Sequence, residues 1–152
     1  MRLMKQAWAL LLILGAVGCA TGSKGGAVQP RPQIDFVQLV GASEVQSVGP
    51  FDVKYGMRIT NPSTQPITLR RIELRQIGTG TYMLTRNAPI LRQDAIEPGG
   101  SIEVSFWQHA YSRVLPGSFG SSEPVTLRVV TFFASPHGSF QQIKQVVLGQ
   151  FD

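Results

Sequence analysis

The sequence has one cysteine among its 152 residues, Cys19, so no disulfide bond can form within the chain. Charged residues make up only 15% of it. The apolar stretch at residues 7–17 has 11 residues, whereas a helix needs about 20 to cross a bilayer. This length disfavours an uncleaved transmembrane anchor. We expect a domain that is stabilised by packing alone.

Residue patterns that carry catalysis are also scarce. The two histidines, His109 and His137, have no Cys, Asp or Glu at metal-ligand spacing, and no Gly-x-Ser-x-Gly motif is present. The glycines at Gly78 and Gly80 do not form a dinucleotide-binding motif. His137 is expected in a solvated Pro-His-Gly turn, and His109 at the rim of a strand, with a catalytic base as the alternative for His109. We predict a non-enzymatic protein with no cofactor, no metal and no identified small-molecule substrate.

The N-terminus has the order of features of a bacterial lipoprotein signal peptide. Two basic residues precede an apolar run at 7–14, and the small residues Ala16-Val17-Gly18 precede Cys19. This resembles a lipobox, with Ala where Leu is usual. We predict that residues 1–18 are cleaved and that Cys19 carries a diacylglyceryl group on sulfur and an acyl chain on its amine. Ordinary secretory cleavage, which leaves an unmodified thiol, is the alternative.

Residues 19–33 are rich in Gly, Ser, Pro and polar residues and are predicted to be a flexible tether. Ala20 is not the Asp that favours inner-membrane retention in proteobacterial lipoproteins, so by that resemblance the protein faces the periplasm from the outer membrane. Removing Arg2 and Lys5 lowers the formal net charge from +5 to +3. The basic composition is therefore poor support for nucleic-acid binding, and we predict none.

Residues 34–152 are predicted to form an all-β domain, a seven- to eight-stranded antiparallel immunoglobulin/fibronectin-like sandwich. Apolar and polar residues alternate at 51–59, which indicates a half-buried strand. Further strands are expected at 34–40, 44–48, 67–74, 81–85, 101–107, 124–133 and 140–148, with 124–133 in a central position. The last segment also fits helical spacing, so a terminal helix is the alternative there.

The strands at 51–60 and 67–74 are predicted to pair as a hairpin, because turn-forming residues separate them. The apolar positions change from odd to even after Leu69, which predicts a β-bulge at Arg70 and Arg71. Placing Ile59 opposite Ile67 then sets Lys54 opposite Glu73 and Asp52 opposite Arg75.

The strand that ends in Ile59-Thr60-Asn61-Pro62, followed by Pro66-Ile67-Thr68-Leu69, Ile72-Glu73-Leu74 and Ile102-Glu103-Val104, resembles the WHy (water stress and hypersensitive response) domain of the late-embryogenesis-abundant type 2 group. The resemblance covers roughly residues 34–148. It implies a fibronectin-like sandwich, a link to stress or desiccation tolerance, and no catalytic residues. Asn61 and Pro62 match its most recognisable motif, and we interpret them as structural turn residues.

Two groups of side chains are predicted interaction surfaces. The first is a basic face on the hairpin, which either is solvated and salt-paired or attracts anionic headgroups; it comprises Lys54, Arg58, Arg70, Arg71 and Arg75. The second is the row Trp107, His109 and Tyr111, which alternates with Val104 and Phe106. This row is either exposed and adhesive or packed against other residues of the domain.

These features predict an envelope lipoprotein that is anchored in the membrane through Cys19 and acts as a WHy-like binding or stress-protective module. The alternative is an accessory or scaffold subunit of an envelope protein assembly, which docks through a strand edge or through the aromatic row.

Overall fold

The computed structural model describes residues 29–41, 49–78, 80–86, 88–112 and 124–149, which form eight strands and no helix. The strands are β1 (Gln33–Val40), β2 (Gly49–Thr60), β3 (Ile67–Ile77), β4 (Tyr82–Leu84), β5 (Ile90–Ile96), β6 (Ser101–Ser112), β7 (Val125–Ser135) and β8 (Gly138–Leu148). The predicted signal peptide, Cys19 and the predicted strand at 44–48 lie outside the described residues.

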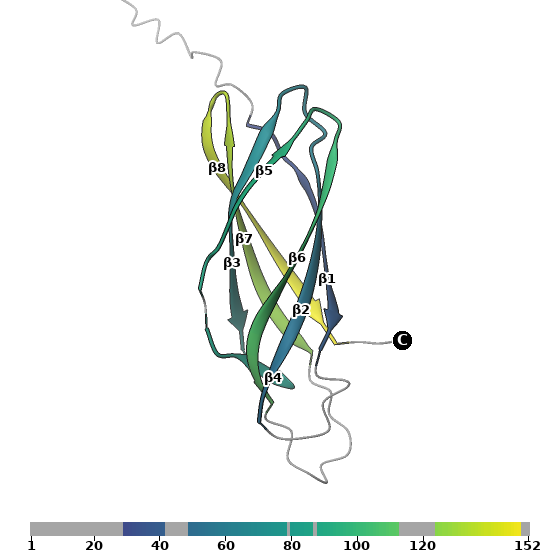
Figure 1. Ribbon diagram of the computed structural model, residues 1–152, viewed down its shortest axis with the longest axis vertical. Helices are drawn as coiled ribbons and strands as arrows, with labels where there is room; N and C mark the ends of the chain where they lie inside the picture. Colours follow the sequence, from purple (N-terminus) through teal and green to yellow (C-terminus); the bar gives the residue numbers. More distant parts are fainter. Residues whose placement is uncertain (1–28, 42–48, 79, 87, 113–123, 150–152) are drawn as a thin grey trace, which may run out of the picture.

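The strands form two four-stranded antiparallel sheets. Sheet A has the order β1-β2-β6-β4, and sheet B has the order β5-β3-β7-β8. The sheets lie face to face along the long axis of the molecule (Figure 1). The predicted all-β sandwich is therefore confirmed, and β7 lies centrally in its sheet as predicted. No helix in the described part of the chain has the length and apolarity to cross a membrane.

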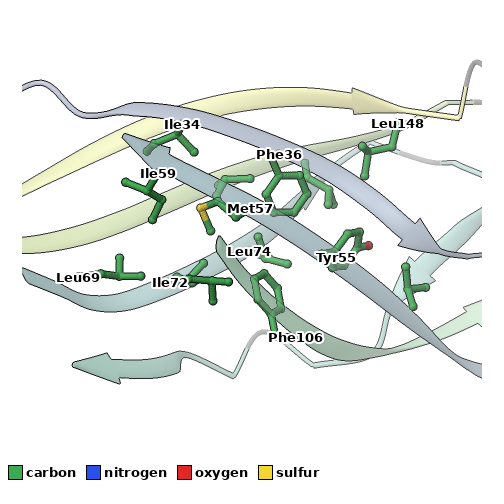
Figure 2. Packing of buried hydrophobic residues seen from close by; sticks show 14 of the residues in the cluster. Ile34, Phe36, Tyr55, Met57, Ile59, Leu69, Ile72, Leu74, Phe106 and Leu148 are labelled. Carbon is green, nitrogen blue, oxygen red and sulfur yellow. The ribbon is translucent and has the colours of Figure 1, made fainter. Parts of the chain in front are cut away.

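The core lies between the two sheets, where alternate side chains of each strand face inward. On β2, Val53, Tyr55, Met57 and Ile59 are buried, and side chains of sheet B meet them across the interior (Figure 2). Full burial of a side chain of this size contributes about 1.5–3 kcal/mol. A continuous core of this kind lets the domain fold without a disulfide.

The predicted hairpin between 51–60 and 67–74 is wrong. β2 pairs with β1 and β6 in sheet A, whereas β3 pairs with β5 and β7 in sheet B. Ile59 accordingly lies opposite Ile34 and Ile102. The alternation correctly identified the buried face of each strand, but residues 61–66 carry the chain from one sheet to the other.

The predicted cross-strand charge pairs are therefore also absent. Lys54 lies opposite Trp107 and Asp52 opposite His109 in sheet A. In sheet B, Glu73 lies opposite Val130. Arg75 lies opposite Arg128, so the predicted attraction is replaced by a pair of like charges.

The predicted β-bulge is confirmed. The register of β3 shifts between Leu69 and Arg71 against both of its neighbours. Leu69 and Ile72 are fully buried, whereas Arg70 is exposed and Arg71 is half-buried. The inserted residue therefore places two consecutive arginines on the outside while the apolar face stays in the core.

The ends of the domain differ from the sequence-based prediction in detail. Residues 138–148 form strand β8, so the alternative of a terminal helix is wrong. β5 was not predicted, and β6 extends to Ser112.

Pro30 and Pro32 are buried, so the last residues of the predicted tether pack against the domain. β1 begins at the end of the sandwich that holds the β7–β8 turn (Figure 1).

Candidate interaction surfaces

The outer face of sheet A carries the aromatic row on β6. Phe106 and Ala110 point into the core, so Trp107, His109 and Tyr111 stand on the outside. Trp107 is 55% exposed and Tyr111 is 44% exposed. The alternative that this row packs against other residues of the domain is therefore wrong, and the row is exposed. Because successive outward residues on one strand are about 7 Å apart, the row runs in one line.

Charged residues of β2 lie beside this row. Lys54 Nζ is 5.6 Å from the centre of the Trp107 ring, which is a cation–π contact. His109 Nδ1 contacts Asp52 Oδ1 across the strands, and both side chains are more than half exposed. Thr85 donates a hydrogen bond to the backbone carbonyl of His109, and within the described residues no serine or threonine hydroxyl is hydrogen-bonded to the imidazole. Sequence spacing missed this pair because 57 residues separate its members.

Apolar side chains of β1 extend the same face. Val37 and Leu39 are each about half exposed. Val37 pairs with Gly56 of β2, and a Cβ at Gly56 would lie only 3.0 Å from Leu39 Cδ1. The absence of a side chain at Gly56 thus lets Leu39 pack down on the sheet. We call Val37, Leu39, Trp107 and Tyr111 the aromatic face.

The remaining charges of sheet A alternate in sign. Arg58 lies between Asp35 of β1 and Glu103 of β6 in the register. Opposite charges in adjacent strands stabilise each other by about 0.2–1 kcal/mol. The predicted single basic face is wrong, because Lys54 and Arg58 lie on sheet A and the three β3 arginines lie on sheet B.

The outer face of sheet B keeps the three β3 arginines of the predicted basic face and gains Arg128 of β7, which the sequence did not place there. The guanidinium of Arg71 stacks 3.9 Å from the centre of the Phe132 ring. Its Nε lies 3.0 Å from Glu73 Oε1, an ion pair in which the N–H does not point at the carboxylate. We call Arg70, Arg71, Arg75 and Arg128 the arginine face.

Asn61 fastens the segment that joins the sheets. It is fully buried, and its amide nitrogen donates to the carbonyl oxygens of Gln65 at 2.8 Å and Ile96 at 3.1 Å. Its Oδ1 accepts from the Ser63 hydroxyl at 2.7 Å, and its backbone N–H donates to Gly100 at 2.9 Å. Pro62 beside it is exposed. These contacts are those of a structural turn.

A polar network lies behind the lower part of sheet A. Tyr55 donates to the Tyr82 hydroxyl at 2.9 Å, because Tyr82 itself donates to Gln38 Oε1 at 2.6 Å. Burial raises the pKa of Tyr82 to about 12 and raises the pKa of Tyr55 further. Gln76 of sheet B bonds to the backbone of Tyr82 and Leu84, so its amide joins the sheets at this end. The two tyrosine hydroxyls therefore stay protonated and form structural hydrogen bonds inside the domain.

A groove of about 540 Å³ lies where residues 29–31 pass the start of β8. Among the described residues that line it, Arg31 alone is charged. No group of three or more His, Cys, Asp or Glu in the described parts of the chain is placed to hold a metal ion. The two outer faces carry exposed aromatic and basic side chains and are the candidate binding surfaces considered below.

No protein-family model matches the chain, and no curated protein matches it. Solved structures do resemble it. A Bordetella pertussis protein named as ApaA is 15% identical, with a TM-score of 0.51 over 80% of this chain and 94% of that one. The GAE domain of GGA2p from Saccharomyces cerevisiae is 13% identical, with a TM-score of 0.43 over 81% and 94%. At 15% identity, the likeness to the Bordetella pertussis protein extends to the fold alone.

Proposed function

We propose that the protein is an envelope lipoprotein whose sandwich is a non-enzymatic binding module. In this proposal, residues 1–18 are removed, Cys19 is lipidated, and the domain faces the periplasm from the outer membrane. The order of basic, apolar and small residues before Cys19 supports the anchor. Two or more acyl chains hold a protein on a membrane stably.

The observation that carries the binding proposal is the aromatic face. Four large apolar side chains, Val37, Leu39, Trp107 and Tyr111, remain 44–55% exposed on regular strands. Aromatic side chains lose little conformational entropy on binding and dominate the energy of many interfaces. Rigid strands hold these rings in place before a partner arrives, so the ordering cost of binding is small.

The Tyr111 end of this face lies far from the attachment point of the tether, whereas Val37 lies only four residues along β1 from Gln33. Gln33, at the start of β1, is level with Ser101 of β6, whereas Tyr111 is level with Pro50 near the other end of β2. Ten residues of strand separate these levels, which corresponds to about 34 Å. A domain held at residue 33 thus presents Tyr111 away from its anchor.

Two forms of this function are distinguishable. The resemblance to WHy domains supports a stress-protective module that acts on many proteins. The position of the two exposed aromatic side chains, Trp107 and Tyr111, on one face supports an accessory subunit with one fixed partner. The protective form predicts a monomer that reduces heat-induced aggregation of unrelated enzymes, and the subunit form predicts constant co-purification with one protein.

The binding proposal is tested by purification from envelope membranes with Trp107→Ala and Tyr111→Ala combined. We expect this variant to lose its co-purifying protein, or its protective effect, while keeping its fold by circular dichroism. Leu91→Ala is the matched control, because Leu91 is 76% exposed on sheet B. Equal effects of the two variants would contradict a role for the aromatic face.

The anchor is tested separately by intact mass and detergent partitioning of the chain expressed with its own signal, beside Cys19→Ser. We expect a triacylated mass that the substitution removes. A chain that begins at an unmodified Cys19 would instead support secretory cleavage and contradict the anchor.

A further inference from the structure

The outer face of sheet B has an excess of positive charge that sheet A lacks. Its arginine face carries four guanidinium groups, and Glu73 is the acidic residue beside them on β3. On the outer face of sheet A, by contrast, Asp35, Asp52 and Glu103 stand beside Lys54 and Arg58. One face is thus close to neutral, and the other is strongly basic.

Arg75 and Arg128 form the centre of this charge. They lie directly opposite each other on β3 and β7, and both are exposed. Like charges in this position destabilise a sheet. Neither guanidinium has an acidic partner in the described part of the chain, because the Glu73 carboxylate is paired with Arg71. Two adjacent planar guanidinium groups offer a set of donors that matches the oxygens of a phosphate.

Apolar side chains flank the arginine pair. On β8, Gln145 continues the row of Arg75 and Arg128, and Ile143 and Val147 stand two residues to either side of it. Ile143 is 57% exposed and Val147 is 60% exposed. The face therefore combines a basic centre with apolar residues, which is the composition of surfaces that lie in the interface of an anionic bilayer.

We propose that the outer face of sheet B docks on anionic lipid headgroups and that Arg75 and Arg128 bind their phosphates together. Ile143 and Val147 contact the acyl boundary beside them. The assignment rests on the charge and exposure of this face, and it holds with or without lipid on Cys19. Because the outer faces of the two sheets point in opposite directions, a domain docked in this way turns the aromatic face of sheet A away from the bilayer.

Vesicle co-sedimentation tests this proposal. The full chain carrying Cys19→Ser is mixed with vesicles of phosphatidylcholine alone, or of equal parts phosphatidylcholine and phosphatidylglycerol. We expect tighter binding to the anionic vesicles and a loss of that difference as salt is raised. Any binding through residues 1–18 adds the same background to every variant, so it lowers the fold-change between variants but cannot create one.

Removing the two central charges gives the decisive comparison. Arg75→Gln with Arg128→Gln is expected to bind anionic vesicles about thirty-fold more weakly, because each basic residue at such a surface contributes about 1 kcal/mol. Lys54→Gln with Arg58→Gln removes the same net charge from sheet A. This double variant is expected to bind anionic vesicles roughly as tightly as the chain that carries Cys19→Ser alone.

Three outcomes would overturn the assignment. The first is equal binding to both kinds of vesicle. The second is equal weakening by the two double variants, which would mean that net charge alone matters. The third is displacement by inorganic phosphate at an ionic strength where chloride has no effect, which would assign the arginine pair to a soluble phosphate. Circular dichroism of each variant checks that the fold is intact.

Discussion

The outer faces of sheets A and B are built on the same four-stranded antiparallel scaffold but arrange their charges in opposite ways. In sheet A, Arg58 stands between two carboxylates and Lys54 lies over an aromatic ring. In sheet B, Arg75 stands against Arg128. Charges that neighbours already neutralise leave the aromatic rings as the available binding groups. Charges without such neighbours are themselves available to an anionic partner.

The segment at residues 61–66, which connects the two sheets, should show the largest effect of a single substitution on the free energy of unfolding. Asn61→Ala removes the amide that bonds Gln65 and Ile96 and leaves buried carbonyl groups without their donor. We expect the free energy of unfolding to fall by about 3 kcal/mol, measured by urea titration.

Pro62→Ala is the control for this prediction, because Pro62 is the exposed neighbour of Asn61 in the same segment. Its expected loss is below about 1 kcal/mol. Losses of similar size in the two variants would mean that Asn61 does not hold the sheets together.

The side chains that the two sheets contribute to their shared core also differ, and high pH should reveal the difference. The buried tyrosine pair lies behind sheet A, and burial raises the pKa of Tyr82 to about 12. An unfolded tyrosine loses its proton near pH 10, so above that pH the unfolded chain binds fewer protons than the folded one. Stability should therefore be complete below about pH 10 and fall by about 2 kcal/mol per tyrosine as pH rises towards 12.

Tyr82→Phe isolates this contribution. The variant loses a hydrogen bond to Gln38 at every pH, but its unfolding free energy should depend less steeply on pH above 10 than that of the unsubstituted chain. Urea titrations at a series of alkaline pH values measure the slope. An unchanged slope would mean that the Tyr82 hydroxyl does not stay protonated in the folded domain.

Reversing one charge should have the smallest effect on the free energy of unfolding, and this effect should have opposite signs on the two outer faces. Arg128→Glu places an acid opposite Arg75 and should raise the free energy of unfolding by about 0.5 kcal/mol at low salt. Arg58→Glu places an acid between Asp35 and Glu103 and should lower it by a similar amount.

Salt is the control for both substitutions. Raising the ionic strength should bring the unfolding free energies of the two variants together, because exposed charges are screened. Changes of the same sign in both variants would contradict the difference in charge arrangement between the faces.

The sequence was sufficient to identify most strands and their buried faces, because alternation in β2, β3 and β7 is a local property. The bulge at Arg70 and Arg71 was found in the same way. The hairpin was predicted wrongly because each apolar face fits several partners equally well, and no local pattern shows that the segment after Thr60 crosses between sheets.

β5 was missed because its inward-facing row is not apolar throughout. Arg92 and Asp94 lie between Ile90 and Ile96 on that row and pair with each other at 2.7 Å. The pairing of His109 with Asp52 and the arrival of Arg128 beside Arg75 were likewise unpredictable, since both depend on strands that are distant in sequence. Alternation along a single strand correctly placed the aromatic row on one face of β6, but the sequence left open whether that face is exposed or packed, and only the structure shows its exposure.

Crosslinking in intact cells tests most directly whether the outer face of sheet A binds protein and the outer face of sheet B binds lipid. A photoreactive amino acid is placed at Tyr111 on sheet A or at Ile143 on sheet B, both of which are exposed. We predict protein adducts from position 111 and phospholipid adducts from position 143. Protein adducts from position 143, or lipid adducts in equal amounts from both positions, would contradict the account.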